Sequence, residues 1–197
     1  MDHKFILASG SPRRIEMMEE NSFPVLVMPS DIEEHIPDFL TPEEAVMFLA
    51  MSKAMDVKNR LDADRYGDDN PVITAADTVV VFEDQILGKP KDRADALAML
   101  VPMSGKSHRV MTGVAISFTD RALTFCFCET SKVYFKEMPE EEILQYVKTA
   151  EPYDKAGGYA VQETFSKYID HIEGDRDNII GFPWKRFRDT LDRLLSD

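Results

Sequence analysis

The sequence feature that most constrains the fold is a pair of long β-rich runs, residues 108–118 and 123–135, with a polar turn between them at Thr119-Asp120-Arg121. Two such runs joined by a short turn predict a β-hairpin. Elsewhere, helix-forming segments alternate with short strand-like segments, as in proteins that place helices against a sheet. Because hairpins and interleaved helices occur in one chain, we expect a mixed sheet within a single α/β domain that covers residues 1–197.

Capping signals locate several helices. Ser11 is expected to cap a helix that has Pro12 at its first position, and residues 41–44 (TPEE) are a capping box that opens a helix ending near Arg60. The polar, acidic stretch over residues 62–71 is interpreted as a loop within the domain. The remaining expected elements are helices over residues 92–101, 139–148 and 184–195, and strands over residues 4–8, 23–28, 72–75, 78–82, 168–172 and 178–180.

The charge and hydropathy of the chain exclude several classes of partner. A net charge of −13 argues against a protein that coats long nucleic acid, although a local basic cluster or a divalent ion still permits one small nucleotide. No apolar run reaches the roughly 20 residues that span a membrane, and the N-terminal apolar stretch is too short for a secretory signal. We therefore expect a cytoplasmic protein without a membrane partner, in which Cys126 and Cys128 are reduced packing residues.

The run LASGSPRR, residues 7–14, is suited to binding an anion. A helix N-terminus presents unpaired N–H groups and a partial positive charge, and Ser9 adds a hydroxyl donor. Arg13 and Arg14 add permanent positive charge in a planar fork that matches phosphate oxygens. Taken alone, the run is equally typical of a capped surface helix with two solvated arginines.

Four further candidates have both a structural and a functional interpretation. Asp77 lies at or near the end of a strand, where a carboxylate is suited to a metal ion or to an attacking water. Lys53, in the middle of a helix, is either a surface residue or a counter-charge for phosphate. Lys89 lies in the turn GKPKD, which is either a hairpin tip or a rigid turn that holds this lysine in a defined direction. The acidic run over residues 31–35 (DIEEH) is either a solvated loop or a magnesium site.

The sequence also contains a residue, Gln162, that is suited to recognising a nucleobase. Gln162 ends the run DKAGGYAVQ, and its carboxamide carries both a donor and an acceptor. The edge of uracil or thymine offers an N3–H group between two carbonyls, and a carboxamide can pair with that edge. The glycines at 157 and 158 allow close backbone approach. Gln162 is therefore a candidate for recognising a pyrimidine.

Taken together and in order, these motifs resemble those of one family. The motifs are LASGSPRR, DIEE, SKA, AADTVV, LGKPKD, SGKSHRVMTGVAI, DKAGGYAVQ and NIIGFP, and they resemble the Maf family from Leu7 to about Pro183. The resemblance implies a fold similar to that of the inosine triphosphate pyrophosphatases, with a strongly twisted mixed sheet flanked by helices and a deep cleft. It also implies hydrolysis of a nucleoside triphosphate between the α- and β-phosphates. The products are a monophosphate and pyrophosphate, the cofactor is Mg²⁺ or Mn²⁺, and the protein is a monomer or a homodimer.

The resemblance further implies a role for individual residues. Asp77 matches the family's proposed proton acceptor, and the metal is expected on Glu33 and Asp77. The positions that match the phosphate site are Ser9, Arg13, Arg14, Lys53 and Lys89. The specificity positions are Arg13, Thr78 and Gln162, a combination similar to the branch that acts on dTTP and UTP. Modified pyrimidine nucleotides with the same base edge are expected to fit as well.

Two other functions remain open for this chain. One alternative is a non-catalytic nucleotide-binding regulator of cell division, and the other is a purine pyrophosphatase acting on ITP or XTP, in which Gln162 would have no evident role.

The chain also departs from the family pattern in two places. After Gln162 the chain reads ETFS, residues 163–166, where the family often has a Gly-rich loop. Arg176 stands where an aromatic residue is common. Both departures bear on the base pocket more than on the type of reaction.

Overall fold

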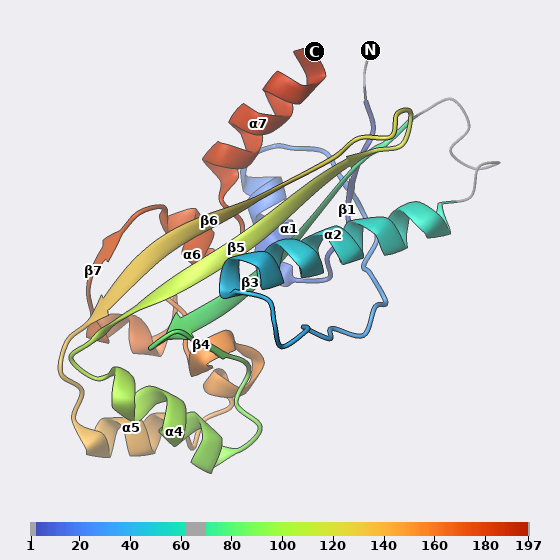
Figure 1. Ribbon diagram of the computed structural model, residues 1–197. Helices are drawn as coiled ribbons and strands as arrows, with labels where there is room; N and C mark the ends of the chain where they lie inside the picture. Colours follow the sequence, from blue (N-terminus) through green and yellow to red (C-terminus); the bar gives the residue numbers. More distant parts are fainter. Residues whose placement is uncertain (1–2, 62–69, 197) are drawn as a thin grey trace. The chain divides into compact units, whose positions relative to one another are not determined.

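The structure is a computed structural model that describes residues 3–61 and 70–196, and it contains two compact units (Figure 1). The first unit comprises Met1–Asp77, Thr112–Cys128 and Gly181–Asp197. The second comprises Thr78–Met111 and Glu129–Ile180. The single domain expected over residues 1–197 stays a prediction. The loop expected over residues 62–71 falls almost entirely outside the described residues.

A mixed sheet runs through the described part of the chain. Its strands follow the order β2-β1-β3-β5-β6-β7, with β4 paired to β3. β1 pairs in parallel with β2 and β3, whereas the β3–β4 and β6–β7 pairs are antiparallel. The strands are β1 (Phe5–Leu7), β2 (Leu26–Val27), β3 (Val72–Phe82), β4 (Gln85–Leu87), β5 (Ser107–Phe118), β6 (Thr124–Phe135) and β7 (Ile169–Glu173). The expected α/β class and the mixed sheet flanked by helices are confirmed.

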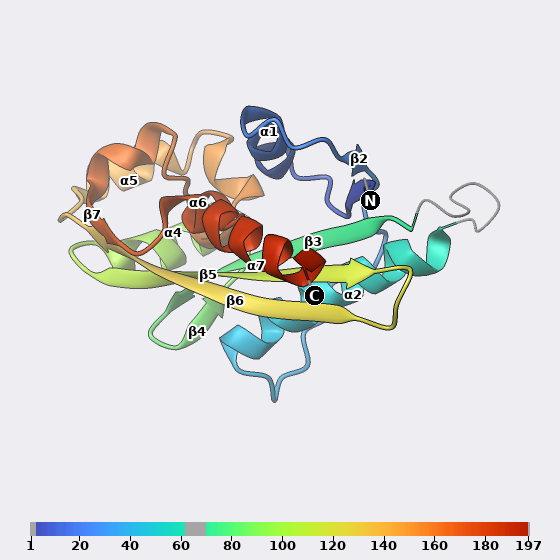
Figure 2. The ribbon, with the colours of Figure 1, turned by 90° about the horizontal axis from the view of Figure 1, so that it is seen from above.

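In the first unit, helix α2 (Pro42–Arg60) covers one face of the strands and α7 (Trp184–Ser196) covers the other (Figures 1 and 2). Alternation along β6 explains the arrangement, because successive side chains of a strand point to opposite faces. Cys126 donates its thiol to the carbonyl of Met47 on α2, while the ring of Phe127 lies under the guanidinium of Arg186 on α7, 4.5 Å from its centroid. Small side chains fill the contact with α2, so this helix approaches the strands closely. They include Ala8, Ala50, Ala54, Ala75 and Ala115.

The start of α2 confirms the capping box. The Thr41 side chain accepts from the Glu44 backbone N–H, and the Glu44 carboxylate accepts in return from the Thr41 N–H at 2.9 Å. The first helix, α1 (Pro12–Glu20), differs from the prediction in its cap. Ser11 occupies the N-cap position with Pro12 after it, but its side chain forms no capping hydrogen bond. Fixed proline geometry, rather than a hydroxyl cap, therefore marks the start of α1.

The second unit has its own apolar core. Helices α4 (Arg93–Met103) and α5 (Glu140–Tyr146) pack with the ends of the long strands and with three short 3₁₀ segments. Its largest buried side chains include Leu100, Phe135, Tyr159 and Phe165. The 3₁₀ segments are η2 (Glu151–Asp154), η3 (Ala156–Gly158) and η4 (Thr164–Tyr168).

One predicted strand is wrong. Residues 178–180 belong to the short helix α6 (Arg176–Ile180). Asp175 accepts from the backbone N–H of Asp177 and so starts the turn, while the buried Asn178 side chain donates to the Val110 carbonyl and to Ser131. Side-chain hydrogen bonds replace the strand ladder that the apolar pair Ile179-Ile180 suggested. None of the helices in the described residues is long and apolar enough to cross a membrane.

Candidate active site

The parallel pairing of β1 with β3 determines where the first candidate residues lie. Leu7 is in register with Thr74, and the next residue, Ala8, donates its N–H to the Thr74 carbonyl at 2.8 Å. The two strands run in the same direction, so Ser9, just beyond β1, and Asp77, three residues beyond Thr74, lie toward the same end of the pair. Both side chains are buried. The end of β1 and the middle of β3 therefore bring a hydroxyl and a carboxylate to the same region of the sheet. Asp77 lies within the continuous strand β3, so the expected position at or near a strand end is wrong.

Lys53 is the centre of the charged cluster in the first unit. Its ammonium Nζ lies 2.6 Å from Asp77 Oδ1 and 2.6 Å from Glu34 Oε1. The Lys53 side chain is 11% exposed and that of Asp77 is 10% exposed, so both charges have left bulk water. A buried charge requires a partner of opposite sign, and these contacts meet that need. The surface interpretation of Lys53 is therefore wrong.

Arg14 joins the same cluster from helix α1. Its Nη1 donates to the Ser9 hydroxyl at 3.2 Å and its Nε donates to the Gly181 carbonyl at 2.9 Å. Burial lowers the pKa of Arg14, while the nearby Asp77 carboxylate acts in the opposite direction. A guanidinium remains charged at neutral pH in such a setting. Arg13 lies half-buried beside it on the first turn of α1.

The acidic residue that contacts Lys53 is Glu34, the neighbour of the expected metal ligand Glu33. Glu33 is exposed, and its backbone carbonyl accepts from the His35 N–H. Glu34, the next residue, supplies the carboxylate on Lys53. A loop without strand or helix periodicity gives no sequence signal that separates two adjacent glutamates. Within the described residues, no three His, Cys, Asp or Glu side chains are grouped as a preformed metal site.

The other candidate residues belong to the second unit. Thr78 is half-buried on β3, while Lys89 and Gln162 are exposed. The turn that carries Lys89 is tied to the segment that carries Gln162, because the Gly157 N–H donates to the Gly88 carbonyl at 2.9 Å. Gly157 has a φ of +67°, and a Cβ there would lie 2.9 Å from the Val80 side chain. Only glycine permits both this conformation and this approach.

A buried polar pair lies behind that segment. The Nε2 atom of His108 lies 2.5 Å from the Tyr159 hydroxyl, and the two rings form an edge-on contact with centroids 5.2 Å apart. Both side chains are buried, and the Nδ1 atom of His108 has no hydrogen-bond partner among the described residues. A neutral His108 that accepts from Tyr159 is the arrangement that costs least here, because a buried imidazolium would lack a counter-charge.

Acidification is expected to destabilise the protein through His108. Burial lowers the pKa of His108 from 6.5 to about 4. The unfolded chain therefore takes up this proton at a higher pH than the folded chain does, and stability is lost as the pH falls from about 6.5 towards 4. The loss approaches about 3 kcal/mol. Urea unfolding of the wild type and of His108→Gln across this pH range measures it, and an equal pH dependence in both proteins would contradict the assignment.

These features define an α/β protein with a cluster of cationic and acidic side chains, centred on the buried Lys53 and Asp77, that is suited to a polyphosphate anion. The chain belongs to the Maf-like protein family, whose model matches residues 4–194. A relative from Bacillus cereus (strain AH187), named dTTP/UTP pyrophosphatase, is 44% identical over 98% of this chain and 97% of its own. A Bacillus cytotoxicus protein of the same name is 43% identical over 98% of this chain and 96% of its own.

The solved structures include a more distant likeness. The Ham1 protein of Staphylococcus aureus is similar with a TM-score of 0.38 and 18% identity, over 67% of this chain and 71% of that one. A likeness at this level does not by itself assign a fold. The mixed α/β sheet described above instead comes from the strand pairing of this chain.

Proposed function

We propose that this protein hydrolyses dTTP and UTP to the nucleoside monophosphate and pyrophosphate. The observation that carries the proposal is the cluster in the first unit, where buried Lys53 holds Asp77 and Glu34 beside the Arg14 guanidinium. The three phosphates of a nucleoside triphosphate carry several negative charges, so a binding site for them needs fixed positive charge. Hydrolysis is also assisted by a general base that accepts a proton from the attacking water, and a carboxylate can serve as that base. The names of the relatives supply the substrate class.

In the proposed reaction, a water oxygen attacks the α-phosphorus and the bond from that phosphorus to the bridging oxygen of the β-phosphate breaks. Asp77 orients the water and accepts its proton. Ser9, Arg13, Arg14, Lys53 and Lys89 are proposed to bind the phosphates, and their charges stabilise the negative charge that develops on the departing pyrophosphate. The contact of Lys53 with Asp77 places a positive charge beside that carboxylate and fixes its direction.

The residues present fit a divalent cation. Carboxylate oxygens are the donors that Mg²⁺ and Mn²⁺ prefer, and Asp77 and Glu34 lie close enough together for each to contact the same Lys53 ammonium. We propose these two residues as the metal ligands, with Glu33 retained as the neighbouring candidate from the sequence. Bound there, the cation would acidify water and neutralise phosphate charge, chemistry that a carboxylate lacks because it is a weak base at neutral pH.

Base selection is proposed to depend on Gln162, with Arg13 and Thr78 as further specificity positions. Gln162 is exposed on a segment whose flanking backbone is held in place, so its carboxamide is available to a ligand. A carboxamide that pairs with the imide edge of uracil or thymine leaves unpaired groups when cytosine takes that place, and such mismatches are costly.

A cytoplasmic location is part of the proposal. Its nucleotide substrates are cytoplasmic metabolites, and the two cysteines are free. Whether the protein is a monomer or a homodimer stays a prediction.

A panel of nucleoside triphosphates, assayed for pyrophosphate and for orthophosphate with Mg²⁺ and again after EDTA treatment, tests the proposal. We expect pyrophosphate from dTTP and UTP, and from modified pyrimidines that share their edge, with about 10²-fold lower kcat/KM for CTP and the purine nucleotides. EDTA should stop turnover and added Mg²⁺ should restore it. A preference for ITP or XTP, or binding of every nucleotide without turnover, would favour one of the two alternatives instead.

A further inference from the structure

The segment that carries Gln162 is closed by an ion pair. This segment, here called the 154–163 loop, begins at Asp154 and ends at Glu163. Lys155 Nζ lies 3.0 Å from Glu163 Oε2, so a residue near the start of the loop contacts its last residue. The Lys155 side chain is only 6% exposed, whereas that of Glu163 is 37% exposed. The pair therefore lies at the surface of the unit with its positive end buried.

All three N–H groups of Lys155 have acceptors within the loop and the turn before it. Besides Glu163, its Nζ donates to Asp154 Oδ1 at 2.6 Å and to the Glu151 carbonyl at 2.7 Å. Burial lowers the pKa of Lys155, but the hydrogen bonds to the two carboxylates outweigh it, and the net direction is upward. An ammonium has three donors, so none remains for a substrate phosphate. Lys155 therefore holds the loop together rather than binding a ligand.

The loop has two more attachments, one on each side of Gln162. Before it, the Tyr159 hydroxyl is bonded to the buried His108 and the side chain of Val161 is buried. After it, the Thr164 hydroxyl donates to Glu151 Oε1 at 2.7 Å. Gln162 itself is exposed. The residues on both sides of Gln162 are thus fixed, and the carboxamide projects from a braced backbone.

We propose that the Lys155–Glu163 ion pair determines base specificity by positioning Gln162, which rests on the proposed role of Gln162 as base reader. A carboxamide discriminates between nucleobases only if its donor and acceptor stand at defined points, because pairing energy falls steeply with distance and angle. This ion pair, here called the brace, ties the backbone on the C-terminal side of Gln162 to the start of the loop. Lys155 and Glu163 act through Gln162 and are positioning residues.

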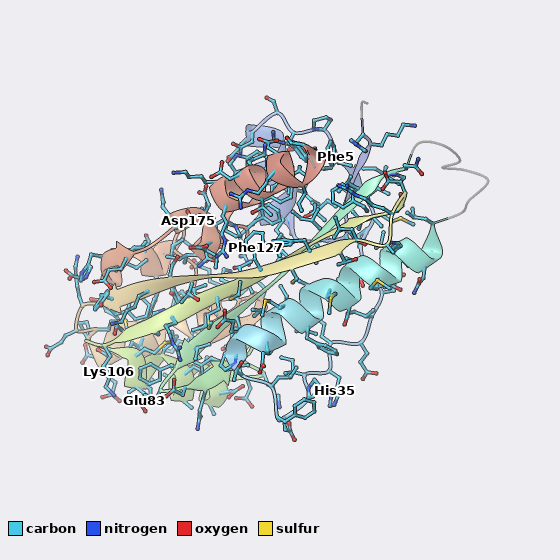
Figure 3. The ribbon with its side chains drawn as sticks, turned by 45° about the horizontal axis from the view of Figure 1, so that its top comes forward. Phe5, His35, Glu83, Lys106, Phe127 and Asp175 are labelled. Atoms are coloured by element: carbon cyan, nitrogen blue, oxygen red, sulfur yellow. The ribbon has the colours of Figure 1, made fainter. Side chains whose placement is uncertain are left out.

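The test compares Glu163→Gln and Lys155→Met with a matched control. Glu163→Gln retains the side-chain volume and removes the charge, and Lys155→Met retains the length and removes the donors. The control is Glu83→Gln, which removes the charge from another ion pair of the same unit, with Lys106 Nζ 3.0 Å from Glu83 Oε1 (Figure 3). The readouts are kcat and KM for UTP and CTP, because these substrates share a ribose and differ at the base edge, with the melting temperature as a check on folding.

Loss of the brace is expected to lower the UTP-to-CTP ratio of kcat/KM by about tenfold, mainly through a higher KM for UTP. The kcat for UTP should stay within about threefold of the wild type, because no phosphate contact changes. The control should match the wild type. An unchanged ratio in folded Glu163→Gln would overturn the proposal, whatever Lys155→Met does to folding.

The outcome also separates this inference from the proposed function. A wild type that releases pyrophosphate from UTP while Glu163→Gln keeps its base preference would overturn only the brace. A wild type that releases no pyrophosphate from any pyrimidine would overturn the proposed function. In that event the same variants are compared by equilibrium binding of UMP and CMP, where an unchanged ratio of affinities would overturn the brace independently.

Discussion

Replacing Asp77 with asparagine is expected to lower kcat for pyrophosphate release from dTTP by about 10³-fold. Asparagine has nearly the same shape, but its amide cannot accept a proton from water. It also cannot provide the negative charge that faces Lys53, whose Nζ lies 2.6 Å from Asp77 Oδ1. Lys53 keeps its second partner, Glu34, at 2.6 Å, so the buried ammonium is not left alone and the fold should persist. Steady-state kinetics with direct pyrophosphate detection measures the change.

The control for this substitution is Asp84→Asn, which changes an exposed aspartate of the β3–β4 turn. Asp84 pairs with Arg109 and has a φ of 64°, a conformation that asparagine tolerates. This variant should retain the kcat of the wild type. Binding of the non-hydrolysable α,β-imido analogue of dTTP shows whether Asp77→Asn still forms its site. A variant that binds the analogue and turns over within tenfold of the wild type would exclude Asp77 as the group that accepts the proton.

A substitution at Gly113 is expected to have the largest effect on stability. Gly113 lies on β5, where α2 crosses the strand, and a Cβ there would lie 2.3 Å from the Val46 carbonyl oxygen and 2.7 Å from the Met47 nitrogen. Both are backbone atoms of a helix, so no rotation of a side chain relieves the overlap. Gly113→Ala would therefore push α2 away from the strands, and we expect a loss of at least about 3 kcal/mol in the free energy of unfolding.

Gly88→Ala is the matched control, since a Cβ at Gly88 would meet no heavy atom within 4 Å and its φ is not in the left-handed region. Its free energy of unfolding should lie within about 1 kcal/mol of the wild type. Urea denaturation of both variants measures the difference. Equal stability of Gly113→Ala and Gly88→Ala would mean that α2 does not approach β5 as closely as described.

The parts of the fold that the sequence predicted are those set by local chemistry. The capping box at residues 41–44 satisfies backbone groups at the N-terminus of α2, so the helix begins where the sequence indicated, and it also ends at the predicted Arg60. The two long β-rich runs and the turn between them were found as β5 and β6. Two other predictions needed adjustment, because residues 72–75 and 78–82 form one continuous strand and residues 23–28 contribute only β2.

Where the sequence failed, distant residues decide the local structure. Residues 178–180 have the composition of a strand, but Asn178 finds its partners on Val110 and Ser131, far along the chain, and the segment is helical. The same explanation applies to Lys53. A lysine in the middle of a helix is usually solvated, and only the positions of Asp77 and Glu34 in the fold make it a buried counter-charge.

The residues of the candidate site also fall into two groups, those that the sequence predicted and those that it did not. Ser9, Arg14, Lys53 and Asp77 were named from their motifs, and the structure brings these four together in the first unit. Glu34 was missed because its neighbour Glu33 has the same side chain and a loop carries no periodicity. The roles of Lys155 and Glu163 were also missed. Their ion pair joins residues eight positions apart across a loop of irregular structure, and no sequence pattern marks such a contact.

Identifying which phosphorus–oxygen bond breaks is the most direct test of the proposed function. Hydrolysis of dTTP in H₂¹⁸O, followed by mass spectrometry of both products, shows which phosphorus the water attacks. Attack on the α-phosphorus predicts one ¹⁸O atom in dTMP and none in pyrophosphate. Label in the pyrophosphate, or release of orthophosphate in its place, would contradict the proposal that Asp77 directs water to the α-phosphorus.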